Sequence, residues 1–157
     1  MIIELSPQKI IQGAFTCWNQ EGPGVDLVVD LKKLTFKENS IEEIYSFHVL
    51  DHLFEDEIIP ALENWRKCLK PGKKLFVIVD DFEYLARAFV GGDISIEELN
   101  SSFAHPTNIT RESLLKYFKS VGFEEEKTHM WYGDIMNQRG EIILPKKHFE
   151  LIFDANK

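Results

Sequence analysis

The sequence predicts an α/β fold in which a mostly parallel sheet carries helices on both faces. Short apolar runs alternate with one-sided helical patterns through the middle of the chain, which is the order of a β-α-β unit. Residues 74–79 are almost continuously apolar, as expected of a central strand covered on both faces. With 157 residues, of which 44% are hydrophobic, the chain has the size of one domain with one core. We therefore expect a single domain over residues 1–157, with ligands beyond the carboxyl ends of its strands.

The first half of the chain predicts four short strands and one long helix. The strands are expected at residues 1–5, 14–18, 26–30 and 43–47. Too few residues separate the first two strands for a full crossover helix between them. The helix carries one apolar stripe, which must cover a sheet, made of Ile58, Leu62, Trp65 and Leu69. Pro71-Gly72 is expected to end this helix and to turn the chain into the strand at residues 74–79.

The second half predicts two more helices and a final pair of strands. One helix is capped by Asp80 or Asp81 and ends at Gly91-Gly92, and the other runs from Thr110 to Gly122. The tail is interpreted as two strands, around residues 127–132 and 148–153, which are most simply antiparallel.

Charge and composition exclude several classes of partner. Eighteen basic and 26 acidic side chains give a formal net charge of -8, which repels nucleic acid and acidic membrane surfaces. No apolar run approaches the roughly 20 residues that span a bilayer, and the first residues lack the pattern of a secretory signal. We therefore expect a cytoplasmic protein. Cys17 and Cys68 lie in apolar stretches and are expected to be free, buried thiols.

The middle of the chain resembles the small bacterial branch of the Rossmann-like, class I S-adenosylmethionine-dependent methyltransferases. In that family a strand ending in Asp-Leu precedes a Leu-x-Phe-x-x-Asn-Ser segment, a Ser-His-Val-Leu-Glu-His-like loop and a helix ending in Leu-Lys-Pro-Gly-Gly. The matching segments are Asp30-Leu31, Leu34 to Ser40, Ser46 to His52 and Leu69 to Lys73. The resemblance implies a seven-stranded sheet with the last strand antiparallel, S-adenosylmethionine as cofactor and a small molecule as substrate.

The same resemblance implies where the two ends of the cofactor lie. It places the adenine beside Asp30 and Leu31. It places the methionine end near Ser46, Phe47 and His48, which follow one another at the end of a predicted strand. The adenine needs an apolar slot, and the methyl group needs a cavity from which water is excluded.

Two further cofactor positions depart from the family pattern. The family's glycine-rich turn after the first strand corresponds here to Leu5 and Ser6, within Glu4-Leu5-Ser6-Pro7-Gln8, which contains no glycine. The acidic residue that binds the ribose hydroxyls corresponds to Trp18, whose indole donates one hydrogen bond and accepts none. The cofactor motif is therefore degenerate. If the alignment slips by a residue or two, the ribose could instead be bound by Asn19, Gln20 or Glu21.

Histidines supply the candidate catalytic and substrate-binding groups. His48 or His52 could act as a general base, because an imidazole titrates near neutrality. Their H-x-x-D-H spacing is similar to the H-x-x-E-H zinc motif of some metallopeptidases, but a third ligand at a recognisable spacing is absent. We therefore expect no metal. His105 precedes the last helix, where the family often has a substrate lid, and is assigned to the substrate pocket by analogy.

Two functions remain open from the sequence. The first is transfer of the sulfonium methyl group to a small molecule, which needs alignment of the acceptor and, for a protonated acceptor, a base. The second is a non-catalytic methyltransferase-like protein that keeps the fold for binding or assembly. The segment from Leu5 to Trp18 separates these alternatives, because it carries the departures from the cofactor motif.

Overall fold

A six-stranded sheet with the order β3-β2-β1-β4-β5-β8 organises the computed structural model. The structure describes residues 1–102, 105–123, 135–136, 142–144 and 150–157. The strands of the sheet are β1 (Ile2–Leu5), β2 (Phe15–Trp18), β3 (Leu27–Val28), β4 (Ile41–Phe47), β5 (Leu69–Asp80) and β8 (Glu150–Asn156). The first five are parallel, and β8 is antiparallel to β5. Two short strands, β6 (Ile135–Met136) and β7 (Ile142–Leu144), pair only with each other.

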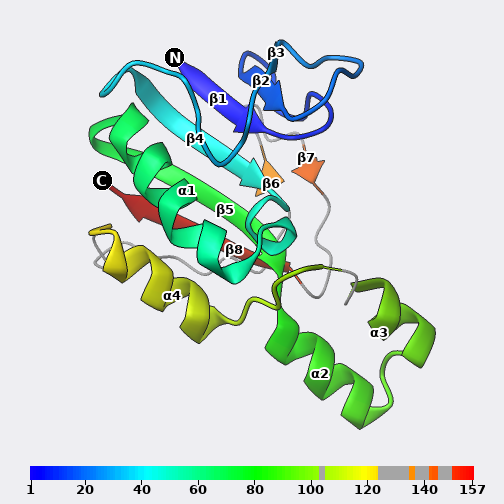
Figure 1. The fold of residues 1–157 in the computed structure, drawn as a ribbon. Coiled ribbons are helices and arrows are strands. Elements are labelled where there is room, and N and C mark those ends of the chain that lie inside the picture. Colours follow the sequence, from blue (N-terminus) through cyan, green and yellow to red (C-terminus); the bar gives the residue numbers. More distant parts are fainter. Residues whose placement is uncertain (103–104, 124–134, 137–141, 145–149) are drawn as a thin grey trace.

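Helices lie on one face of this sheet and beyond one of its ends. They are the short 3-10 helix η1 (Leu50–His52) and the helices α1 (Glu55–Cys68), α2 (Phe82–Gly91), α3 (Ile96–Ser102) and α4 (Arg111–Ser120). Figure 1 shows α1 and α4 together against one face, whereas α2 and α3 extend away from the end of β5. Residues 1–49 are all described and contain no helix, so the connections in the N-terminal half add no second helical layer. None of the helices in the described residues has the length and apolarity needed to span a bilayer.

The core forms where α1 packs on the sheet. Ile58, Leu62 and Trp65 are fully buried, as their helical stripe predicted. They belong to one cluster with apolar residues of the central strands, including Ile3 and Leu75. Because these strands are central and parallel, the core fixes the carboxyl ends of β1, β4 and β5 relative to one another.

The predicted α/β fold with a mostly parallel sheet is confirmed, including its two tested strand pairings. In the described residues the main sheet has six strands rather than the expected seven, and the helices that cover it lie on one face rather than on both (Figure 1). β4 and β5 are parallel, with Ser46 opposite Val77, and β2 and β3 are parallel, with Cys17 opposite Leu27. Cys17 and Cys68 are free and buried, as expected. The predicted strand at residues 127–132 lies outside the described residues.

Several boundaries differ from the sequence prediction. β3 is only two residues long and Val28 is 49% exposed, because this strand is at the edge of the sheet and packs on one side only. β5 begins at Leu69 rather than at Lys74, and a register irregularity between Ile41 and Glu43 of β4 accommodates Pro71-Gly72. The helix α3 was not predicted, because its seven residues are too few to show a clear period.

The caps of α2 and α4 explain where these helices begin. Asp81 caps α2, since its Oδ1 accepts hydrogen bonds from the backbone N-H groups of Glu83 and Tyr84. The hydroxyl of Thr110 accepts a bond of 3.1 Å from the Ser113 N-H at the start of α4. Of the two cap candidates, Asp81 and not Asp80 is therefore the N-cap of α2.

Candidate active site at the carboxyl ends of the strands

The strand order reverses between β1 and β4, and this is where ligands bind in open α/β sheets. The loops that leave these strands begin at Ser6 and His48. The cofactor residues expected from the sequence are the last residues of β1, β2 and β4 or follow β1, β3 and β4, so they lie on both sides of this position.

The loop after β1 is a closed turn rather than an open one. Ser6 is fully buried, its hydroxyl donates to the Gln8 carbonyl at 2.6 Å, and it accepts from the Gln8 N-H at 3.3 Å. Its own N-H donates to the Cys17 carbonyl of β2. Leu5 is also fully buried, within the core and opposite Cys17 and Ser46. Its side chain therefore packs in the core, and Ser6 is the first residue of the turn.

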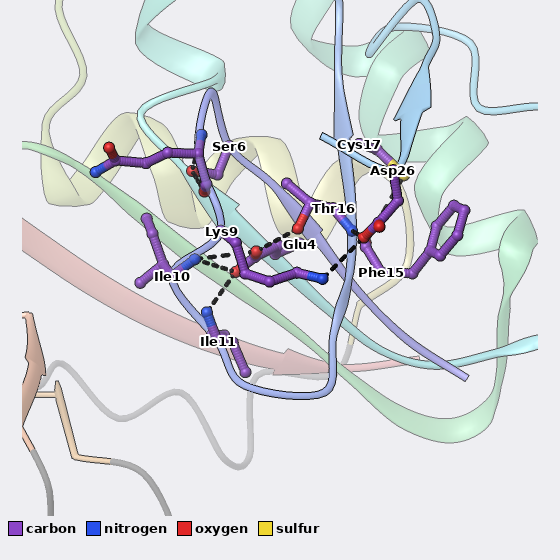
Figure 2. A network of polar contacts seen from close by, with 10 residues as sticks. Glu4, Ser6, Lys9, Ile10, Ile11, Phe15, Thr16, Cys17 and Asp26 are labelled. Atoms are coloured by element: carbon purple, nitrogen blue, oxygen red, sulfur yellow. Dashed lines mark hydrogen bonds and ion pairs between the residues drawn. The ribbon is translucent and has the colours of Figure 1, made fainter. Parts of the chain in front are cut away.

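A buried carboxylate holds the remainder of this loop, as Figure 2 shows. Glu4 of β1 is fully buried, and its oxygens accept hydrogen bonds from the backbone N-H groups of Ile10 and Ile11, the shortest at 2.7 Å. The Thr16 hydroxyl donates to the same carboxylate at 2.6 Å. An acid inside the apolar run Met1 to Leu5 was a visible signal for such a role, because a buried carboxylate needs donors.

The residues after β2 and β3 lie nearer the surface. Trp18 ends β2, is half-buried and packs against the core cluster. Asp30 is exposed, and its Oδ1 accepts a hydrogen bond from the Lys32 N-H. Leu31 is buried, and its carbonyl accepts a bond of 2.6 Å from the Trp65 indole. That bond ties the segment expected beside the adenine to the middle of α1.

The end of β4 places His48 in an unusual backbone conformation. Ser46 and Phe47 are buried, and His48 follows with φ of 50°, a left-handed value that is uncommon for a residue with a side chain. Its N-H donates to the Ile78 carbonyl at 2.9 Å, which holds this conformation against β5. Strained residues of this kind concentrate at functional sites.

Four side chains from three segments meet just beyond His48. We call them the His-Asp cluster: His48, Asp51, Asp80 and His105. His48 Nδ1 lies 3.2 Å from Asp51 Oδ2 and 3.8 Å from Asp80 Oδ1. His105 Nε2 lies 3.4 Å from Asp80 Oδ2 and 4.0 Å from Asp51 Oδ2. The two acids thus lie between two imidazoles at the carboxyl ends of β4 and β5.

The cluster is mostly enclosed. The side chains of Asp51, Asp80 and His105 are 2%, 13% and 16% exposed. Among the described residues, Asp51 Oδ1 and His105 Nδ1 are buried without a hydrogen-bond partner. The Thr107 N-H donates to the Asp51 carbonyl, which ties the His105 loop to η1.

Electrostatics keep the central acid charged. Burial raises the pKa of the Asp51 carboxyl, but the hydrogen bond and charge of His48, with smaller effects of His105 and His52, leave the pKa below its ordinary value. Desolvation lowers the pKa of His52, and the charge of Asp51, which acts in the opposite direction, offsets only part of this shift. The His52 ring meets the His105 ring edge-on, at 4.4 Å between centroids. Asp51 is therefore an anion at neutral pH.

A small pocket adjoins the cluster. It has an empty volume of about 210 Å³, part of it open to solvent, and its walls include Asp51, Asp80, His105, Phe82 and Leu85. Its enclosed part has room for about one water-sized sphere. This space suits an ion or a water molecule and is too small to enclose an adenosyl group.

The structure joins His48 and His105, which the sequence assigned to separate roles, and adds two acids to them. Asp51 was visible only as the middle of the H-x-x-D-H motif, and Asp80 only as a cap candidate. Two successive acids after an apolar strand were the available signal, because one cap needs one carboxylate. His52 does not join the hydrogen bonds of His48, since it lies against His105 instead.

Comparison with known proteins finds one family whose model matches part of the chain. The family model "Methyltransferase domain" matches residues 3–77. No curated protein matches the chain.

Solved structures share the fold at low sequence identity. An S-adenosylmethionine-dependent methyltransferase from Mesorhizobium loti is 12% identical, with a TM-score of 0.61, over 99% of this chain and 90% of that one. One from Methanosarcina mazei is 12% identical, with a TM-score of 0.58, over 87% and 68%. The 1,6-didemethyltoxoflavin-N1-methyltransferase of Burkholderia thailandensis, which binds its substrate and S-adenosylhomocysteine, is 10% identical, with a TM-score of 0.61, over 99% and 70%.

S-adenosylmethionine is accordingly the cofactor that the family match and the fold support. The resemblance of the sequence to the class I, Rossmann-like S-adenosylmethionine-dependent methyltransferases is thereby confirmed, by a family match over residues 3–77, which is less than half of the chain, and by a fold shared over most of its length.

Proposed function

We propose that the chain transfers the methyl group of S-adenosylmethionine to a small molecule at the carboxyl ends of β4 and β5. The observation that carries this proposal is the contact of 3.2 Å between His48 and the buried, ionised Asp51. A carboxylate orients an imidazole and stabilises its cation, which is the arrangement of a general base. His48 is therefore the residue to remove the acceptor's proton.

Methyl transfer requires few other groups from the protein. The methyl group leaves sulfur as the acceptor atom attacks from the opposite side, so alignment at about 3 Å supplies most of the catalysis. A small acceptor is favoured because the structure of the B. thailandensis N1-methyltransferase holds the small molecule 1,6-didemethyltoxoflavin together with S-adenosylhomocysteine. The net charge of -8 also disfavours a polyanionic acceptor.

We further propose that the cofactor is held weakly. The Ser6 hydroxyl is engaged within its own turn, and the Glu4 carboxylate holds the backbone of Ile10 and Ile11. The position that would bind the ribose is Trp18, which has no acceptor atom. The remaining contacts for the cofactor are then those near Asp30, Leu31 and the end of β4.

The same observations favour a second candidate, a methyltransferase-like protein without turnover. A protein of this fold that has lost the contacts that bind the cofactor can still bind a ligand or a partner through the pocket beside His105. This candidate predicts neither binding of S-adenosylmethionine nor a role for His48 in a reaction.

The experiment measures S-adenosylhomocysteine formation at millimolar S-adenosylmethionine with a panel of small hydroxyl, amine and heteroaromatic acceptors. We expect acceptor-dependent product for the wild type and its loss in His48→Gln. Lys116→Gln, on the exposed side of α4, is the matched control and should retain the activity. If isotopically labelled S-adenosylmethionine shows no saturable binding at millimolar concentration in equilibrium dialysis, the non-catalytic candidate replaces this proposal.

A further inference from the structure

The Asp51 side chain is carried by a turn that is too short to hold it in place by itself. η1 is three residues long, and its N-cap is Val49, whose apolar side chain makes no capping bond. The turn is closed by backbone hydrogen bonds of 3.1 and 3.2 Å, and the hydrogen-bond geometry of such short 3-10 helices is poor. The contact of 3.2 Å between Asp51 and His48 therefore depends on what holds η1 from outside.

The core fixes only one side of η1. Val49, Leu50 and Leu53 are buried and belong to the core cluster. Apolar contacts are non-directional, so they hold the turn against the core but leave its rotation, and with it the direction of the Asp51 carboxylate, weakly fixed. Hydrogen bonds to the other side of the turn can fix that rotation, because they are directional.

Thr107 supplies two such hydrogen bonds. Its N-H donates to the Asp51 carbonyl at 3.3 Å, and its hydroxyl donates to the Leu53 carbonyl at 2.6 Å. One residue thus holds the backbone of η1 at Asp51 and just beyond the end of the turn. Thr107 and Leu53 are 54 residues apart in the sequence, so this contact exists only in the folded chain.

The segment that carries Thr107 is itself fixed. Ile109, two residues later, is 1% exposed and belongs to the core cluster. Its carbonyl accepts a hydrogen bond of 3.0 Å from the Phe82 N-H at the start of α2, and Thr110 then caps α4. Thr107 is therefore a fixed point against which η1 is oriented.

We propose that Thr107 is a positioning residue: it holds η1 in the orientation that directs the Asp51 carboxylate to Nδ1 of His48. This inference rests on the proposed function, in which His48 is the base. A carboxylate only accepts hydrogen bonds, so the contact keeps the proton of the neutral His48 ring on Nδ1 and leaves Nε2 free to take a proton. Thr107 acts on the reaction through Asp51 and does not need to touch the reacting atoms.

Kinetics of variants in this one loop test the proposal. Thr107→Val removes the hydroxyl at nearly constant volume and should lower kcat by about 10- to 100-fold, because small misplacements of catalytic groups cost that much. The KM for S-adenosylmethionine should stay within a few-fold of the wild type. Thr107→Ser restores the donor and should recover most of the rate.

Thr110→Val is the matched control. It removes another threonine hydroxyl from the same loop, one that accepts a bond of 3.1 Å from the Ser113 N-H and does not contact η1. Loss of this cap should lower stability as Thr107→Val does, but should leave kcat within a few-fold of the wild type.

A second readout needs no turnover. Long-range 1H-15N spectra at alkaline pH identify which ring nitrogen of His48 carries the proton, with His48→Gln giving the assignment. We expect the proton on Nδ1 in the wild type and in Thr110→Val, and a shift toward the Nε2-H form in Thr107→Val. If the wild type transfers no methyl group, the proposed function fails, while these spectra still decide the role of Thr107.

Circular dichroism establishes that each variant is folded, and Thr107→Ala replaces Thr107→Val if valine prevents folding. The proposal is overturned if wild-type His48 carries its proton on Nε2, or if loss of the Thr107 hydroxyl changes neither the ring tautomer nor the kcat of an active protein. It is equally overturned if only one of these two readouts changes in an active protein, or if Thr110→Val alters them as strongly as Thr107→Val.

Discussion

Trp65 is the residue on which the packing of α1 depends most. Its side chain is fully buried in the core, and its indole N-H donates to the Leu31 carbonyl at 2.6 Å. Trp65→Ala should lower the free energy of unfolding by about 3 to 5 kcal/mol, because it opens a large cavity and leaves that carbonyl unpaired. Trp65→Phe keeps most of the volume and should cost about 1 to 3 kcal/mol. Urea unfolding curves measure both, and a midpoint unchanged in Trp65→Ala would contradict the buried position.

The Cys17 thiol should make the free energy of unfolding fall as the pH rises in the alkaline range. Burial, followed by the charges of Asp26 and Glu4, raises the pKa of its thiol from 9.0 to about 12. Below pH 9 both folded and unfolded states carry the thiol, whereas between pH 9 and 12 only the unfolded state loses the proton. The stabilising contribution is therefore complete below pH 9 and is lost as pH rises, by at most about 1.4 kcal/mol per pH unit.

The comparison that isolates this effect is wild type against Cys17→Ala. Other groups titrate in the same window in both proteins, so only the difference in slope belongs to Cys17. We expect the free energy of unfolding to fall less steeply with pH in Cys17→Ala, as measured by urea unfolding from pH 8 upward. Parallel slopes would show that the thiol has an ordinary pKa.

At the scale of elements, the loop between β1 and β2 depends on one carboxylate. Glu4 accepts hydrogen bonds from Ile10, Ile11 and Thr16 while it is itself fully buried. Glu4→Ala should destabilise the protein by about 3 kcal/mol, since three donors lose their acceptor. Glu4→Gln retains a carbonyl acceptor and should cost less.

Hydrogen exchange locates this effect in the loop. The amides of Ile10 and Ile11 should exchange faster in Glu4→Ala, while amides of α4, such as that of Leu114, change only as global stability changes. Unchanged protection at residues 10 and 11 would mean that the loop is held by other contacts.

At the scale of the whole molecule, the prediction concerns the affinity of the protein for S-adenosylmethionine. We predict that wild-type binding is weak or undetectable by calorimetry, because the turn after β1 is closed on itself and Trp18, at the position proposed to bind the ribose, has no acceptor atom. Affinity in the low micromolar range or tighter would contradict this prediction and would indicate that the ribose is bound by Asn19, Gln20 or Glu21.

Variants that change the turn after β1 test why S-adenosylmethionine binding is predicted to be weak. Leu5 belongs to the core, so glycine there would remove packing, and the changes belong at Ser6 and Gln8. Trp18→Asp combined with Ser6→Gly and Gln8→Gly should raise cofactor affinity more than Trp18→Asp alone, because we propose that the closed turn and the indole each remove cofactor contacts, and neighbouring changes are not additive. Equal affinities in folded variants would show that the obstruction lies elsewhere.

The sequence by itself determined the features that depend on neighbours along the chain. The stripe through Trp65 and the cap at Thr110 marked helices correctly, because helical period and capping act over a few residues. Pro71-Gly72 did not mark the end of the helix or the start of the strand, because β5 begins at Leu69 and runs through both residues. The parallel pairing of β4 with β5 also followed, since a helical crossover between neighbouring strands returns the chain in the same direction.

Only the tertiary structure decided which polar groups meet. Sequence could not tell which of Asp80 and Asp81 caps α2, nor that Glu4 serves a loop rather than a ligand. It treated His48 with His52, whereas folding brings His48 to Asp80 and sets His105 beside both acids. The physical reason is that these contacts join segments far apart in the chain, whose approach is set by how the helices and strands pack and not by any local preference.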